Sequence, residues 1–140
     1  MARKDSVEKL RQVALFSSCS QRDLSKIARA ADEIAIPAGS VLMEQGDMGR
    51  EAFVILDGTA VVRRNGRKIA ELEAGESVGE LSLLDLGPRT ATVEAGTDMR
   101  ILVLTARAFT GLIDESPALA RKMLASMAAR VRDLDRKIFG

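Results

Sequence analysis

The side chains best suited to chemistry lie close together near the middle of the chain, within residues 79–93. Gly79 and Glu80 open a short apolar turn, and Arg89 follows nine residues after that carboxylate, directly after Pro88. Glycine lets a backbone approach closely, and the start of a helical turn offers free N–H groups to an anion. The arginine adds a planar, permanently charged fork for phosphate oxygens. These residue types suit a ligand with a hydroxyl pair and a negative charge, such as a sugar phosphate.

The same segment resembles the phosphate-binding cassette of the cyclic-nucleotide-binding domain family. That cassette reads aromatic-Gly-Glu-aliphatic-Ala-Leu-Leu, then a short spacer, then Pro-Arg-(Ala/Ser/Thr)-Ala-Thr-Val. The chain matches it except at Val78, where the family has an aromatic residue, and at Ser82, where it has alanine. A pattern of many positions with matching spacing is far more specific than a lone glycine motif. The resemblance covers about residues 15–139.

The resemblance implies a cyclic nucleotide, cAMP or cGMP, as the ligand. Arg89 is expected to bind its phosphate and Glu80 its ribose 2′-hydroxyl, while the amides of Ser82 and Thr90 point at the phosphate and that of Gly79 lies near the ribose. Threonine at position 90 occurs in members that prefer either nucleotide, and family analogy favours cAMP narrowly. The expected ligand-binding set is Gly79, Glu80, Leu81, Ser82, Arg89 and Thr90.

Several of these residues also have a purely structural interpretation. Arg89 can pair internally with Glu80 or Asp85, since arginines commonly form such bridges. The Ser82 hydroxyl can contact the phosphate or cap the turn. Three apolar residues are candidates for the wall beside the base, although each is equally well explained as core. They are Met43, Val61 and Leu72.

Helical patterns lie at both ends of the chain. Residues 6–13 predict a short helix, and Ser20 with Asp23 predicts the start of a second one. Ser116 followed by Pro117 predicts the start of a long terminal helix. Apolar residues then recur at steps of three or four, which makes one stripe. That stripe is Leu119, Met123, Met127, Val131, Leu134 and Ile138.

Between the helices, short apolar runs such as 53–56, 60–62 and 101–104 alternate with turn glycines. Many short strands with regular turns predict a β-sandwich or barrel. The basic run 63–68 is best explained as a solvated hairpin, because Asn65-Gly66 at its centre is a strong hairpin signal. The family's fold agrees: a mainly β, eight-stranded jelly-roll barrel with N-terminal helices, a short cassette helix and a long C-terminal helix.

We therefore expect one domain over residues 1–140. Its parts would be N-terminal helices over 1–33, the jelly roll over 34–105 and C-terminal helices over 106–140. In the family the terminal helix closes over the base as a lid or pairs with its twin in a homodimer. A chain that stops at Gly140 leaves no room for the helix-turn-helix domain of related bacterial transcription regulators. The expected output is therefore an unknown downstream protein partner or an oligomer.

Composition bounds the remaining possibilities. The 21 basic and 20 acidic residues nearly cancel, so neither nucleic acid nor a membrane surface is an expected partner. No apolar run is long enough to span a bilayer, and the lone Cys19 fits a reducing cytoplasm. The absence of histidine disfavours metal sites, haem and nucleophile relays, so we expect no metal, no cofactor and no enzymatic activity.

The sequence thus predicts a regulatory binding module that captures a cyclic nucleotide, cAMP in preference to cGMP, and signals through its C-terminal helix. The alternative is an interaction or structural protein whose jelly roll has a degenerate pocket. Val78 in place of the aromatic residue is the main observation that favours this alternative.

Overall fold

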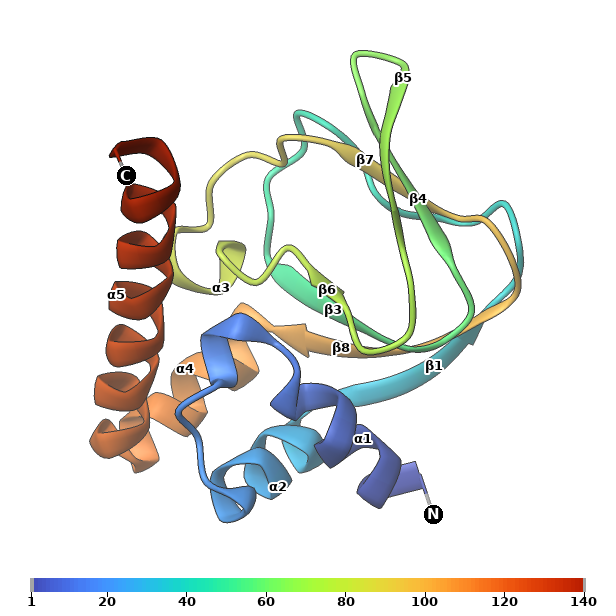
Figure 1. Ribbon diagram of the computed structural model, residues 1–140. Helices are drawn as coiled ribbons and strands as arrows, with labels where there is room; N and C mark the ends of the chain where they lie inside the picture. Colours follow the sequence, from blue (N-terminus) through green and yellow to red (C-terminus); the bar gives the residue numbers. More distant parts are fainter. Residues whose placement is uncertain (1, 140) are drawn as a thin grey trace.

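The computed structural model describes residues 2–139, and its strands form two antiparallel sheets of four strands each (Figure 1). One sheet has the order β1-β8-β3-β6 and the other β2-β7-β4-β5, which confirms the mainly β jelly-roll fold with flanking helices. The strands are β1 (Asp32–Ile36), β2 (Val41–Met43), β3 (Glu51–Asp57), β4 (Ala60–Arg64), β5 (Arg67–Leu72), β6 (Ser77–Val78), β7 (Thr92–Ala95) and β8 (Met99–Thr105).

Helices flank the sheets on one side of the molecule, and α3 lies between β6 and β7 in the chain (Figure 1). They are α1 (Ala2–Arg11), the 3-10 helix η1 (Ala14–Phe16), α2 (Gln21–Ala30), α3 (Ser82–Asp85), α4 (Ala106–Glu115) and α5 (Pro117–Phe139). The predicted start of α2 is confirmed: Ser20 accepts a hydrogen bond from the Asp23 N–H, and the Asp23 carboxylate accepts one from the Ser20 N–H. This capping box satisfies two of the helix's free donors.

Strands β3 and β8 are apolar on both faces, because each separates two hydrophobic cores. Ala52 and Val54 face the helices, whereas Phe53 and Ile55 face the second sheet. Side chains alternate across a strand with a period of two, so one continuous apolar run can supply both cores. The pair β3 and β8 is therefore the central layer that joins the helical side to the rest of the jelly roll.

The basic run is the hairpin that the sequence predicts. Asn65 and Gly66 link β4 to β5 with φ of 54° and 80°, the left-handed conformation that a tight hairpin turn requires. The first helix, in contrast, begins and ends earlier than the expected 6–13, at Ala2 and Arg11.

The terminal helix α5 differs along its length. Leu119 and Met123 are buried against η1 and the other helices, and Lys122 forms an ion pair of 2.6 Å with Asp23. From residue 128 to residue 138 every side chain is exposed, so the predicted apolar stripe packs only in its first half. Helix α5 lies beside α4 and η1 and not over a sheet (Figure 1).

Candidate functional site

A cavity of about 520 Å³ lies between the second sheet and the segment around α3. Residues 77–82 and 87–91 line it, together with Met43, Val62, Arg64 and Asp85. All six residues of the expected ligand-binding set are in this lining. The fold therefore brings Gly79 and Arg89, ten positions apart in the chain, to one cavity.

Arg89 forms the floor of this cavity and is only 7 % exposed. Its Nη1 donates to the Ser82 hydroxyl at 3.0 Å and its Nη2 to the Glu51 carbonyl at 2.8 Å. Its guanidinium lies 5.8 Å from the centre of the Phe53 ring, within the range of a cation–π interaction. Burial lowers the pKa of the guanidinium from its usual value, and the Glu51 charge opposes that shift.

Among the side chains that the structure describes, those of residues 6–138, no carboxylate forms an ion pair with the Arg89 guanidinium. The Glu80 carboxylate accepts from the Ser77 hydroxyl at 3.3 Å, and the Asp85 carboxylate accepts from the Gly87 N–H at 2.9 Å. Neither internal bridge considered from the sequence is therefore formed. A buried charge that lacks a counter-ion is costly, and an anion in the cavity would offset that cost.

The Ser82 hydroxyl has a role that neither sequence interpretation anticipated. It accepts from Arg89 and does not cap α3, whose first turn has no side-chain cap. Its backbone N–H donates to the Gly79 carbonyl at 3.0 Å, whereas the family resemblance implies that this amide points at the phosphate. Ser82 thus orients the guanidinium that would face the ligand.

Both the backbone conformation and the close neighbours at position 79 require glycine. Its φ is +81°, and a Cβ at this position would lie 2.5 Å from Arg89 Nη1 and 3.0 Å from the Glu51 carbonyl. Only glycine adopts this conformation without strain and leaves this space open. The glycine therefore makes room for the arginine ten residues later.

The loop between β2 and β3 holds the arginine's backbone, a role that the sequence analysis missed. The Arg89 N–H donates to the Asp47 carbonyl at 2.7 Å, and the Gly46 N–H donates to the Arg89 carbonyl at 2.9 Å. A Cβ on Gly49 would overlap the Ser82 hydroxyl. The two glycines, three residues apart before a buried strand, are the signal that could have indicated a close approach here.

The apolar part of the lining differs from the expectation at two of three positions. Met43 lines the cavity as predicted, but Val61 and Leu72 do not. Val62 takes the place of Val61, because adjacent residues of β4 face opposite sides of the sheet. Leu72 is half-buried against the core between the sheets.

The aromatic residue that the family has before the glycine is replaced by Val78, but an aromatic ring still lies nearby. Val78 in β6 pairs with Phe53 in β3, the residue whose ring faces Arg89. An aromatic contact to the arginine is thus supplied from the neighbouring strand.

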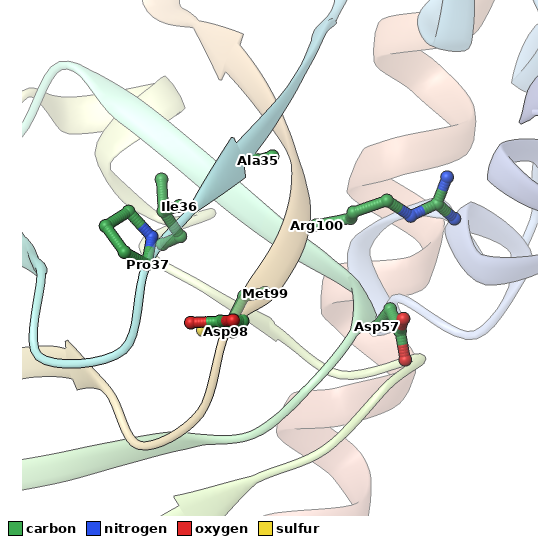
Figure 2. A pocket seen from close by; sticks show the side chains of 7 residues that line it. All are labelled: Ala35, Ile36, Pro37, Asp57, Asp98, Met99 and Arg100. Atoms are coloured by element: carbon green, nitrogen blue, oxygen red, sulfur yellow. The ribbon is translucent and has the colours of Figure 1, made fainter.

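A second hollow of about 400 Å³ lies at the ends of β1, β3 and β8 and contains none of the expected residues (Figure 2). Its polar side chains already have partners. Asp98 accepts from the Ala38 N–H at 2.9 Å, Asp57 from the Gly58 N–H at 3.1 Å, and Arg100 donates to Glu33 at 3.1 Å. Figure 2 shows Arg100 extending away from Asp98. This hollow therefore offers no convergent set of groups for a ligand.

Other reactive groups are sparse in the described part of the chain. Cys19 is buried, and this burial, with the nearby Asp23 charge, raises the pKa of its thiol to about 11. A thiol with so high a pKa is a poor nucleophile at neutral pH. Among the described side chains, no three histidine, cysteine or carboxylate groups gather as a metal ion would need. None of the described helices is long and apolar enough to cross a bilayer.

Known proteins share both the sequence pattern and this fold. Residues 33–116 match the family described as the cyclic nucleotide-binding domain. The N-terminal domain of a transcriptional regulator from Streptomyces coelicolor A3(2) superposes with a TM-score of 0.85 at 29 % identity, over 91 % of this chain and 95 % of that one. The chain therefore belongs to the cyclic nucleotide-binding domain family, whose members are regulatory modules.

Two relatives extend the comparison to longer proteins. A cyclic nucleotide-gated potassium channel of Rhizobium etli is 36 % identical over 108 residues, and the cAMP-dependent protein kinase regulatory subunit of Schizosaccharomyces pombe is 34 % identical over 113. The matches cover 77 % and 80 % of this chain, but only 30 % of the channel and 27 % of the kinase subunit. The chain thus spans less than a third of the length of either relative.

Proposed function

We propose that the protein captures a cyclic nucleotide in the cavity above Arg89 and acts as a regulatory binding module. Arg89 binds the phosphodiester, and the half-buried Glu80 carboxylate accepts hydrogen bonds from the ribose 2′-hydroxyl. The observation that carries this proposal is a buried guanidinium without a carboxylate partner in the described structure. A monoanionic phosphodiester supplies the missing charge.

Leu81 and Thr90 complete the proposed site. Both line the cavity and both are exposed, so they are available to the ligand. We favour cAMP over cGMP, because the Schizosaccharomyces pombe relative is a cAMP-dependent kinase subunit. The Thr90 hydroxyl also suits a guanine amino group, so the proposed preference is small.

Calorimetric titration of the protein with cAMP and cGMP, side by side, tests the proposal. We expect saturable binding with one site per chain, tighter for cAMP. The 2′-deoxy analogue of cAMP is the matched probe for Glu80, and its affinity should be lower by about 10- to 150-fold, the equivalent of one hydrogen bond to a charged group. Absence of saturable binding to either nucleotide at millimolar concentration would contradict the proposal.

The output is proposed to pass through α5. Helix α3, which lines the cavity, contacts α4, and α4 contacts α5. From residue 124 onward, α5 carries an apolar seam at alternating steps of three and four, the spacing of a coiled coil. We call these residues the α5 seam: Leu124, Met127, Val131, Leu134 and Ile138.

We propose that the α5 seam packs against a second copy of the chain in parallel. In that register Arg130 of one copy faces Asp135 of the other, an attractive pair, whereas an antiparallel pair would bring basic residues together. All large seam residues except Met127 are exposed. Nucleotide binding can shift this helix only if the ligand has different affinities for two arrangements of it.

A second candidate is an interaction protein whose cavity has lost its ligand. The observations that favour it are Val78 at the aromatic position and the two internal hydrogen bonds of Arg89. Mass spectrometry of the protein purified from cells separates the two functions. A co-purified cyclic nucleotide supports the first and contradicts the second.

Neither candidate includes a catalytic step or a metal. The downstream protein partner is proposed to recognise the end of the molecule that carries α5, within a reducing cytoplasm that suits the lone thiol of Cys19. Prolonged incubation with cAMP, followed by chromatography of the nucleotide, would reveal turnover if the proposal of a purely binding role were wrong.

A further inference from the structure

A second guanidinium faces the cavity that Arg89 closes from below. Arg64, at the end of β4, is part of the cavity lining, as is Val62 two residues before it. Arg63 lies between them on the opposite face of the strand, where it forms an ion pair of 3.0 Å with Glu94. The period of a β-strand thus assigns one arginine to the outer surface and the other to the cavity.

A hydrogen bond made by the Arg64 side chain holds it in this position. Its Nε donates to the Thr90 carbonyl at 3.0 Å, directly beside Arg89 in the chain. Within the described residues, no carboxylate forms an ion pair with it, and its two terminal nitrogens have no hydrogen-bond partner. Four of the five N–H donors of this guanidinium are therefore available to a ligand.

The hairpin that carries Arg64 is also fixed. The Gln45 amide donates to the Asn65 side-chain oxygen at 2.8 Å, and the Asn65 N–H donates back to the Gln45 side-chain oxygen at 2.8 Å. The Gln45 N–H itself donates to the Thr92 hydroxyl at 3.0 Å. These bonds tie the tip of the hairpin to the loop after β2, so the position of Arg64 is set before a ligand arrives. Such pre-organisation reduces the entropy lost on binding.

The apolar lining indicates which part of the nucleotide meets Arg64. Met43 and Val62 provide the apolar surface that a purine ring needs, and Arg64 lies about 7 Å further along β4 on the same face. A guanidinium is only a donor. Guanine presents two acceptors, N7 and O6, along one edge, whereas adenine presents N7 and an amino group that is itself a donor.

We propose that Arg64 is a specificity-determining residue that donates to N7 and O6 of a guanine base, and that it adds affinity for cGMP that cAMP does not gain. This inference rests on the proposed function, because it places the phosphate at Arg89. In cAMP the adenine amino group cannot accept from the same fork. Arg64 therefore narrows the preference for cAMP by improving the binding of cGMP.

Titration of the Arg64→Ala variant with both nucleotides tests this role, with Arg63→Ala as the matched control on the outer face. A bidentate arginine–guanine contact contributes about 5- to 150-fold, so the dissociation constant for cGMP should rise by that factor. The constant for cAMP should change by less than about twofold, and Arg63→Ala should leave both unchanged. Arg64→Lys keeps the charge but loses the fork, so it should resemble Arg64→Ala.

Three outcomes would overturn the inference. An equal loss for both nucleotides, restored by Arg64→Lys, would mean that Arg64 acts on the phosphate charge and not on the base. Unchanged dissociation constants for both nucleotides in Arg64→Ala would mean that the residue does not contact the ligand. Failure of the unmutated protein to bind either nucleotide would overturn the proposed function itself and this inference with it, so the two failures are distinguishable.

Discussion

The floor of the cavity and the second half of α5 are built in opposite ways. At the floor, Arg89 is fixed by two side-chain hydrogen bonds, a ring and a backbone pairing with the β2–β3 loop. Beyond residue 127, α5 has every side chain exposed up to residue 138, with apolar residues of the α5 seam among them. The first region is complete within one chain, whereas the second leaves apolar surface that only another surface can cover.

This difference separates recognition from output. A pre-organised guanidinium can bind an anion without rearrangement of its supports, so recognition is a property of the single chain. The exposed part of the α5 seam has no packing contacts within the chain. The position of this part of α5 therefore depends on the surface that packs against it. Changes at the floor should therefore alter binding, and changes in the seam should alter association while leaving binding intact.

Removal of the Arg89 side chain should have the largest effect. Truncation of one member of a buried charge pair costs about 2–5 kcal/mol, so Arg89→Ala should weaken the binding of both cyclic nucleotides by about 30- to 5,000-fold. Arg89→Lys should recover little of this, because the lysine ammonium lacks the fork that serves Ser82, Glu51 and the phosphate together. Calorimetric titration measures the loss, and circular dichroism establishes that each variant is folded. Unchanged affinity in a folded Arg89→Ala variant would mean that the floor has no role in binding.

Two leucines of α5 allow a direct comparison of its buried first half with its exposed second half. Leu119 is 2 % exposed and Leu134 is 50 % exposed. Leu119→Ala should lower the free energy of unfolding by about 2–5 kcal/mol, whereas Leu134→Ala should change it by less than about 0.5 kcal/mol at concentrations where the chain is monomeric. Urea denaturation gives both values. Analytical ultracentrifugation should show weaker self-association for Leu134→Ala only; equal association of all three proteins would contradict the proposed pairing of the α5 seam.

Two glycines, one against Arg89 at the floor of the cavity and one on the exposed face of a helix, compare a crowded position with an open one. Gly79→Ala places a Cβ against Arg89 and the Glu51 carbonyl at a φ of +81°, so it should cost about 1–3 kcal/mol of stability and weaken nucleotide binding. Gly111 lies in the exposed face of α4, where a Cβ meets nothing within 4 Å, and Gly111→Ala should stabilise the protein by about 0.5–1 kcal/mol. Thermal unfolding should show a lower melting temperature for Gly79→Ala and a higher one for Gly111→Ala. A harmless Gly79→Ala would show that the floor tolerates displacement of the arginine.

The sequence predicts most of the fold because its local signals act independently of distant contacts. The capping box at Ser20, the hairpin at Asn65-Gly66 and the start of α5 at Pro117 all lie where short-range patterns place them. The exposure of the second half of α5 could not be predicted, because an apolar stripe has the same spacing whether or not a surface covers it.

For the site, the sequence predicts which residues line the cavity better than how they contact one another. The cassette motif brings Gly79, Glu80 and Arg89 to one place, but the bond from Arg89 to Ser82 and the support from the β2–β3 loop depend on tertiary packing. Val62 lines the cavity in place of the predicted Val61 because of the register of β4. A run of apolar residues does not show which of its members face the cavity. The sequence likewise places Arg64 on a solvated hairpin, because it does not fix the strand register that puts this residue in the cavity lining.

A crystal structure of the protein with bound cAMP would test the central claim most directly. We predict that the cyclic phosphate lies within hydrogen-bond distance of both terminal nitrogens of Arg89, each of which keeps its bond to Ser82 or Glu51 and donates its second N–H to a phosphate oxygen. Clear density for the nucleotide elsewhere, with Arg89 still bonded only to Ser82 and Glu51, would contradict it.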